Sequence, residues 1–205
     1  MLTVVDHPLI RTAMTRLRDG RTPTREFRTL LHEVAQLLAF EVTRDLEVRA
    51  MRVKTPLATA RGWKLRRGVV LVPVLRAGLG MLPGFLSVLP DATVAVIGLK
   101  RDEITLATHT YLTKIPGDLS GNDVILLDPM LATGGSASTA IALLRTHRAK
   151  KIRLASLVAA PPGVNRVLEA HPGTRIFTAA LDTRLDKQGF IVPGLGDAGD
   201  RVFGV

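Results

Sequence analysis

The sequence of residues 124–139 limits the possible folds of the chain more than any other segment does. It reads VILLDPMLATGGSAST. Four apolar residues of the kind found in buried strands lead into the carboxyl group of Asp128, and two glycines and Ser136 follow a few residues later. Glycine tolerates positive φ and lets backbone N–H groups converge on an anion. The stretch therefore predicts a strand, a phosphate-binding loop and a helix, with Asp128 placed to bind polar groups such as sugar hydroxyls.

The helix after this loop is indicated by apolar residues at helical spacing, from Ala137 to Leu144. Ser136 is expected to cap it, and its N-terminus would favour an anion. The alternative is a tight strand–helix turn with no ligand. Such a turn would need neither the carboxylate nor the Thr-Gly-Gly-Ser cluster, so the phosphate loop is the preferred interpretation.

The rest of the chain predicts an α/β domain over residues 1–205, with a mainly parallel sheet flanked by helices. Helical patterns separate most of the apolar, β-rich runs, which supports crossover connections between parallel strands. These runs are residues 69–75, 93–99, 123–127, 152–159 and 175–180.

Three other segments are predicted from their patterns. Residues 1–50 should be helical, and the wide apolar stripe from Phe27 to Leu38 is expected to pack in the core, or alternatively at a subunit interface. Residues 51–68 are polar and basic, which suggests a hairpin or arm. Residues 100–121 form a long polar connection without clear periodicity, which is typical of a functional flap or a disordered segment.

The C-terminal segment contains GLGDAG at residues 194–199, which matches the GxGxxG pattern. A dinucleotide fingerprint should open a helix within a strand–helix–strand unit, and only six residues follow here. An ordered loop whose bare backbone approaches a ligand is the better interpretation. The sequence also lacks the Gly-Lys-Ser/Thr of a P-loop, a GxSxG elbow and any cysteine, and its histidines are isolated, which argues against a zinc site.

The formal net charge is +10, and most of it lies in residues 1–100, where 16 Lys and Arg stand against 8 Asp and Glu. This excess fits a polyanionic ligand, either a small phosphorylated substrate or a nucleic acid, although solvated arginines could explain much of it. Aromatic residues make up only 4%, which leaves little for stacking on bases. The absence of cysteine favours the cytoplasm, and no secretory signal or membrane span is expected.

Several segments together resemble the uracil phosphoribosyltransferase family. They include DHPL at residues 6–9, PVLRAGLGM at 73–81, DPMLATGGS at 128–136 and IVPGLGDAGD at 191–200. The resemblance implies a type I phosphoribosyltransferase fold and Mg²⁺-dependent transfer of 5-phosphoribosyl from phosphoribosyl pyrophosphate (PRPP) to N1 of uracil, giving UMP and diphosphate. It also implies a flap near residues 100–121, a C-terminal hood near 181–205 and a homodimer or higher homo-oligomer, and it leaves GTP activation open.

The same resemblance assigns site residues. Asp128, Arg76 and Arg101 would be catalytic, with the two arginines on the diphosphate and Asp128 on the ribose hydroxyls, while residues 132–136 would hold the 5′-phosphate. Uracil would be surrounded by Ile191, Gly196, Asp197 and Ala198. The full set implied for PRPP is Arg76, Arg101, Asp128, Pro129, Met130, Leu131, Ala132, Thr133, Gly134, Gly135, Ser136 and Asp197. No protein side chain is implied as a direct metal ligand.

The chain departs from the family pattern at residues 107–110 of the flap, at Phe190, where the family often has Tyr, and at residues 183–184. Two other functions are weighed against uracil salvage. One is transfer to a different base, which would need a different hood. The other is a uridine-nucleotide-sensing regulator that binds RNA through its basic half. A membrane partner is not expected, and nucleic acid is the less favoured partner.

Overall fold

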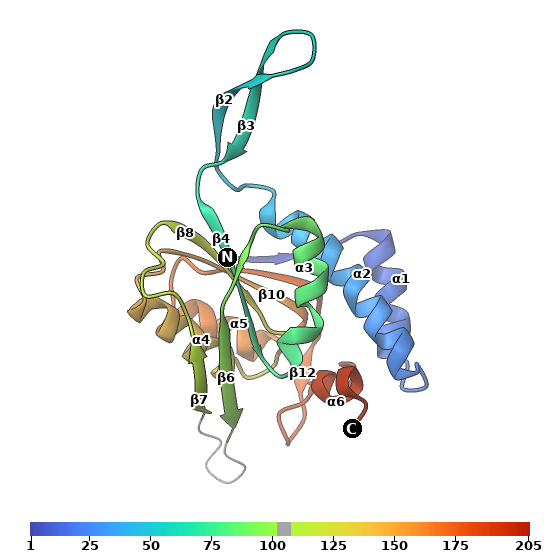
Figure 1. Ribbon diagram of the computed structural model, residues 1–205. Helices are drawn as coiled ribbons and strands as arrows, with labels where there is room; N and C mark the ends of the chain where they lie inside the picture. Colours follow the sequence, from blue (N-terminus) through green and yellow to red (C-terminus); the bar gives the residue numbers. More distant parts are fainter. Residues whose placement is uncertain (102–107) are drawn as a thin grey trace.

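The computed structural model describes residues 1–101 and 108–205. A central sheet carries helices on both faces, and a hairpin arm projects away from it (Figure 1). The strands are β1 (Leu2–Val4), β2 (Val48–Lys54), β3 (Thr59–Leu65), β4 (Gly68–Leu75), β5 (Thr93–Val94), β6 (Val96–Arg101), β7 (Thr108–Lys114), β8 (Asn122–Leu127), β9 (Met130–Leu131), β10 (Lys151–Ala159), β11 (Arg175–Leu181), β12 (Arg184–Leu185) and β13 (Ile191–Val192). The helices are α1 (Pro8–Arg18), α2 (Thr24–Thr43), η1 (Ala77–Gly80), α3 (Leu82–Val88), α4 (Gly135–Thr146), α5 (Pro161–Ala170) and α6 (Ala198–Phe203).

The main path of the sheet runs in the order β1-β11-β10-β8-β4-β6-β7. Neighbouring strands are parallel except for β6 and β7, which are antiparallel. This confirms the predicted α/β class with a mainly parallel sheet. It also brings the ends of β4 and β8 together at one edge, where parallel sheets commonly bind ligands.

Both faces of the sheet are buried, which explains why its central strands read as continuous apolar runs. In β8, Ile125 and Leu127 pack with helices α1, α2 and α3, whereas Val124 and Leu126 pack with α4 and α5. The stripe from Phe27 to Leu38 is part of the first of these cores. The alternative that this stripe forms a subunit interface is therefore wrong, because the chain's own sheet covers it.

The predicted arm is confirmed as the antiparallel pair β2 and β3, which stands clear of the body (Figure 1). Two predictions near the N-terminus and the middle strands need correction. Residues 2–4 are not helical but form β1, paired with β11 through registers such as Leu2 with Ile176. Residues 48–50, also expected to be helical, form the start of β2. Residues 93–99 are not one strand but β5 and β6, which both pair with β4.

The prediction of an irregular connection over residues 100–121 is wrong for residues 108–114, which form β7 at the edge of the sheet. Polar residues dominate this strand because an edge strand faces solvent, and Tyr111 is exposed. Its backbone pairs with β6, for example Thr110 with Leu99, so a tertiary contact rather than an apolar pattern specifies it. Part of the expected flap, residues 102–107 including Ala107, lies outside the described residues.

Candidate active site

The loop between β8 and α4 has the backbone geometry that its glycines predicted. Gly134 has φ +76° and directly precedes α4. A Cβ at Gly134 would lie 2.7 Å from the carbonyl oxygen of Gly163, which lies in the first turn of α5, so the loop and α5 approach too closely for a larger residue. The predicted cap at Ser136 is wrong: α4 starts at Gly135, and no side chain caps it. Ser136 lies in the first helical turn, where free N–H groups still point outward.

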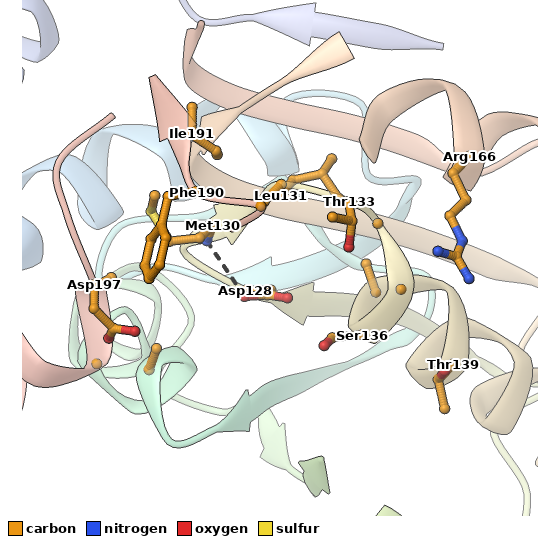
Figure 2. A pocket seen from close by; sticks show the side chains of 18 of the residues that line it. Asp128, Met130, Leu131, Thr133, Ser136, Thr139, Arg166, Phe190, Ile191 and Asp197 are labelled. Atoms are coloured by element: carbon orange, nitrogen blue, oxygen red, sulfur yellow. Dashed lines mark hydrogen bonds between the residues drawn. The ribbon is translucent and has the colours of Figure 1, made fainter. Parts of the chain in front are cut away.

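This loop forms one wall of a cavity of about 560 Å³ (Figure 2). The C-terminal segment forms another, so residues far apart in the sequence share one space. The predicted residues that line it are Asp128, Met130, Leu131, Ala132, Thr133, Gly134, Gly135, Ser136, Ile191, Gly196, Asp197 and Ala198. Figure 2 shows Phe190 and Asp197 on one side of Asp128, and Ser136, Thr139 and Arg166 on the other.

Asp128 lies between these two sides and is half-buried. Burial raises the pKa of its carboxyl group to about 6, and the hydrogen bond from the Met130 N–H, at 3.5 Å, only partly opposes this. A carboxylate with so little compensation is suited to accept hydrogen bonds from a ligand's hydroxyl groups.

Arg76 immediately follows β4, as predicted, but its side chain does not line the cavity. It is 60% exposed, lies 3.5 Å from the carboxylate of Asp200 and stands 5.6 Å from the centre of the Phe203 ring. The next residue, Ala77, lines the cavity, so Arg76 is at the rim. Arg101 is the last residue of β6, and its side chain lies outside the described part of the structure. Pro129 is in the loop but not in the lining.

The C-terminal segment is a loop followed by a short helix, α6, which was not predicted. The Asp197 carboxylate accepts a hydrogen bond from the Asp200 N–H at 2.9 Å and so caps α6. Gly194 and Gly196 both have positive φ, which fits the expectation of a loop that needs bare backbone.

The sequence reasoning missed several lining residues: Ala77, Ala137, Thr139, Arg166, Gly189, Phe190 and Gly199. Arg166 adds a cation from α5, on the side of Asp128 where α4 begins (Figure 2). No local motif marked it, because the close packing of Gly163 against the loop is what brings α5 to the cavity.

Comparison with known proteins identifies the family. The sequence pattern of the family described as "Uracil phosphoribosyltransferase" matches residues 4–205. The chain belongs to the uracil phosphoribosyltransferase family. It is 52% identical to the uracil phosphoribosyltransferase of Oceanobacillus iheyensis, over 98% of this chain and 97% of that protein. It is 48% identical to that of Malacoplasma penetrans, over 100% and 99%.

Two solved structures share the fold of this chain. A protein from Aquifex aeolicus superposes with a TM-score of 0.95 at 38% identity, covering 100% of this chain and 99% of that one. A hypoxanthine phosphoribosyltransferase from Staphylococcus aureus superposes with a TM-score of 0.52 at 12% identity, over 76% and 74% of the two chains, and shows the shared fold alone. As a member of the uracil phosphoribosyltransferase family, the chain is a phosphoribosyltransferase enzyme with the type I fold.

Two further observations concern metal ligands and membrane-spanning helices in the described residues. Within residues 1–101 and 108–205, no group of three or more His, Cys, Asp or Glu side chains could hold a metal ion. A Mg²⁺ ion still fits the cavity, because this ion keeps several waters and is commonly bound by one or two carboxylates plus substrate phosphates. None of the helices in the described ranges has the length and apolar character needed to cross a bilayer.

Proposed function

We propose that the chain transfers 5-phosphoribosyl from PRPP to N1 of uracil, which gives UMP and diphosphate for pyrimidine salvage. The main observation that supports this proposal is that, in a member of this family, the glycine loop before α4 and the segment 191–198 line the same cavity. In the reaction, the bond from C1′ to the diphosphate oxygen breaks, the bond from C1′ to uracil N1 forms, and the N1 proton is lost. Catalysis then rests on positioning and on neutralising the leaving diphosphate.

The order of residues along the cavity supports specific roles. The loop 132–136 would hold the 5′-phosphate, and Asp128, in the middle, would accept hydrogen bonds from the ribose hydroxyls. Arg76 at the rim and Arg101 would neutralise the diphosphate, since guanidinium groups bind phosphates in a bidentate manner.

The opposite side of the cavity would hold the base. Ile191, Gly196, Asp197 and Ala198 would surround uracil, with Asp197 also near PRPP. Backbone N–H and C=O groups there could match the donors and acceptors of uracil. Cytosine would leave buried polar groups unpaired, which is costly enough to exclude it. This argues against transfer to another base.

Mg²⁺ would be bound with PRPP, through substrate oxygens and water, with Asp128 as the nearby carboxylate. When bound, the ion would supply positive charge to the diphosphate. The proposed enzyme is a single domain over residues 1–205, with a flap near residues 100–121 and a hood near residues 181–205. Its expected compartment is the reducing cytoplasm.

We also propose a homodimer, now on different grounds from the α2 stripe. The arm exposes several large apolar side chains, including Met51, Leu57 and Trp63, and a protein surface of this kind usually acquires a partner. Light scattering should give twice the chain mass at micromolar concentration. A monomeric mass would overturn this part of the proposal.

The arm also favours the RNA-binding regulator as a second candidate, because residues 48–67 hold seven Lys or Arg and no acidic residue. Filter binding to RNA at two salt concentrations tests it. Specific, UMP-responsive binding would support this function, and affinity no better than that of an unrelated basic protein would reject it.

The decisive experiment supplies purified protein with PRPP, Mg²⁺ and, separately, uracil, cytosine, hypoxanthine or orotate. UMP formation with uracil alone is expected. Failure with uracil, or an equal rate with another base, would overturn the proposed function.

A further inference from the structure

Gly194, in the loop between β13 and α6, is held on both of its backbone polar groups by one buried ion pair. The Asp182 carboxylate accepts a hydrogen bond from the Gly194 N–H at 2.8 Å, and Arg18 donates to the Gly194 carbonyl at 2.7 Å. Arg18 also donates to both carboxylate oxygens of Asp182, each at 2.7 Å. The side chains of Arg18 and Asp182 are 25% and 7% exposed, so this charge pair is largely shielded from water.

These three residues come from three separate segments. Arg18 ends α1, Asp182 follows β11, and Gly194 follows β13. Gly194 has φ +59°, and a Cβ there would lie only 2.1 Å from the carbonyl oxygen of Ile191. The turn therefore folds directly back on Ile191, which lines the cavity. The ion pair is thus one turn away from the wall assigned to the base.

A second arginine attaches the same loop to the same end of α1. Arg201 donates to the carbonyl of Leu195 at 2.9 Å and to that of Asp19 at 2.7 Å, and also to the carbonyl of Leu17. Its guanidinium stands 4.3 Å from the centre of the Phe27 ring. The last carbonyl groups of a helix lack hydrogen-bond donors within the helix. Here Arg201 is the donor for the carbonyl of Leu17, in the last turn of α1.

We propose that Arg18, acting through Asp182 and Gly194, is a positioning residue that sets the backbone of residues 191–196 for uracil, whereas Asp197 is held separately by its hydrogen bond to α6. This inference rests on the proposed function. Backbone groups must match uracil's donors and acceptors to within about 0.5 Å to discriminate between bases. A loop with two glycines at positive φ does not hold such a position by itself. The ion pair does, because the guanidinium fork of Arg18 donates to the Gly194 carbonyl and to Asp182, which in turn accepts from the Gly194 N–H.

The expected effect is confined to the base side of the cavity. The loop that would hold the 5′-phosphate lies between β8 and α4, and the contacts of Arg18 are instead with Asp182 and Gly194. Loss of Arg18 should therefore weaken uracil binding and leave PRPP binding nearly unchanged. A role in stability alone would not produce this split.

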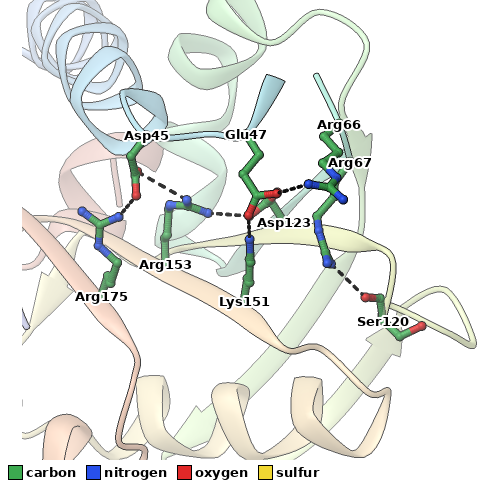
Figure 3. Close-up of polar contacts among 9 residues, drawn as sticks. All are labelled: Asp45, Glu47, Arg66, Arg67, Ser120, Asp123, Lys151, Arg153 and Arg175. Atoms are coloured by element: carbon green, nitrogen blue, oxygen red, sulfur yellow. Dashed lines mark hydrogen bonds and ion pairs between the residues drawn. The ribbon is translucent and has the colours of Figure 1, made fainter. Parts of the chain in front are cut away.

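The chain offers a matched control for stability at the opposite edge of the sheet. Arg153 donates to the Asp123 carboxylate at 2.8 Å, and these side chains are 7% and 4% exposed (Figure 3). Both residues lie near the starts of their strands, whereas the cavity lies beyond the strand ends. Arg153→Ala should destabilise the protein at least as much as Arg18→Ala, because each leaves a buried carboxylate without its partner.

The test compares the unaltered protein with Arg18→Ala, Arg18→Lys and Arg153→Ala, using the uracil KM, the PRPP Kd and the thermal midpoint of each. Arg18→Ala should raise the uracil KM at least about tenfold and change the PRPP Kd less than twofold, since displacement on the ångström scale costs up to roughly a hundredfold. The uracil KM of Arg18→Lys should lie between those of the unaltered protein and Arg18→Ala. Arg153→Ala should lower the thermal midpoint with little change in the uracil KM or the PRPP Kd.

Three results would overturn the inference alone: an unchanged uracil KM in both Arg18 variants, an equal rise in the uracil KM and PRPP Kd, or the same uracil effect in Arg153→Ala. If Arg18→Ala does not fold, Arg18→Lys decides, because it keeps the charge and loses the fork. Absence of UMP formation by the unaltered protein overturns the proposed function, and the inference with it.

Discussion

Replacing Asp128 with asparagine should stabilise the free protein at neutral pH while it impairs the reaction. Burial raises the pKa of the Asp128 carboxyl group from 3.8 to about 6 in the folded protein. The folded state therefore holds its proton more tightly than the unfolded state does. Stability falls as the pH rises from about 4 to about 6, because the carboxylate must then be ionised in a poorly solvating site.

The size of the effect follows from the shift. About two pKa units at 1.36 kcal/mol each give roughly 3 kcal/mol at full ionisation. Asparagine carries no charge, so the stability of Asp128→Asn relative to the unaltered protein should rise by about 2–3 kcal/mol between pH 4 and pH 8. For a chain of this size, that corresponds to roughly 5–10 °C in thermal midpoint.

Urea denaturation of both proteins at pH 4, 6 and 8, without ligands, measures this difference. Asp45→Asn provides a control in which stability should change with pH in the opposite direction. Burial raises the pKa of Asp45, but the charges of Arg153 and Arg175 together hold that pKa below its usual value. That variant should lose stability relative to the unaltered protein as the pH rises. A pH-independent stability difference for Asp128→Asn would show that the pKa of Asp128 is not raised in the folded protein. A near-normal kcat/KM would remove Asp128 from the proposed site.

Three further substitutions test the rim and the phosphate side of the cavity. Arg76→Ala should weaken both PRPP and diphosphate binding, measured by calorimetry, and change stability by no more than about 0.5 kcal/mol, because its contacts are exposed. Arg166→Ala should weaken PRPP and UMP, which both carry the 5′-phosphate, but not diphosphate, and the exposed Arg25→Ala should change none of the three. Gly134→Ala should cost about 1–3 kcal/mol in urea denaturation and abolish UMP formation, because φ is +76° and the carbonyl of Gly163 is 2.7 Å from the added Cβ.

The sequence predicted the central architecture because the apolar runs of β4, β8 and β10 are buried on both faces, which leaves a pattern that local reasoning can detect. It also predicted the glycine loop and Asp128, since a carboxylate at the end of a buried strand, followed closely by glycines, is typical of a ligand-binding loop. The arm was detectable from its polar, basic composition.

Other features depend on contacts that no local pattern encodes. The β7 strand exists because β6 pairs with it, and β1 because β11 does. Arg166 reaches the cavity only because Gly163 lets α5 pack against the loop. The pairing of Arg18 with Asp182 spans most of the chain, and neither residue lies in a recognisable motif.

Carboxylates are used in opposite ways at the two edges of the sheet. Where the strands begin, Asp123 pairs with Arg153, and Asp45 with Arg153 and Arg175 (Figure 3). Where they end, the described partner of Asp128 is a single N–H at 3.5 Å. If the loop after β8 were only a turn without a ligand, removing the charge of Asp128 would stabilise the protein without any loss of activity. An uncompensated carboxylate beside a glycine loop is instead expected where a ligand completes the hydrogen bonding, so the same substitution should both stabilise the free protein and disable it.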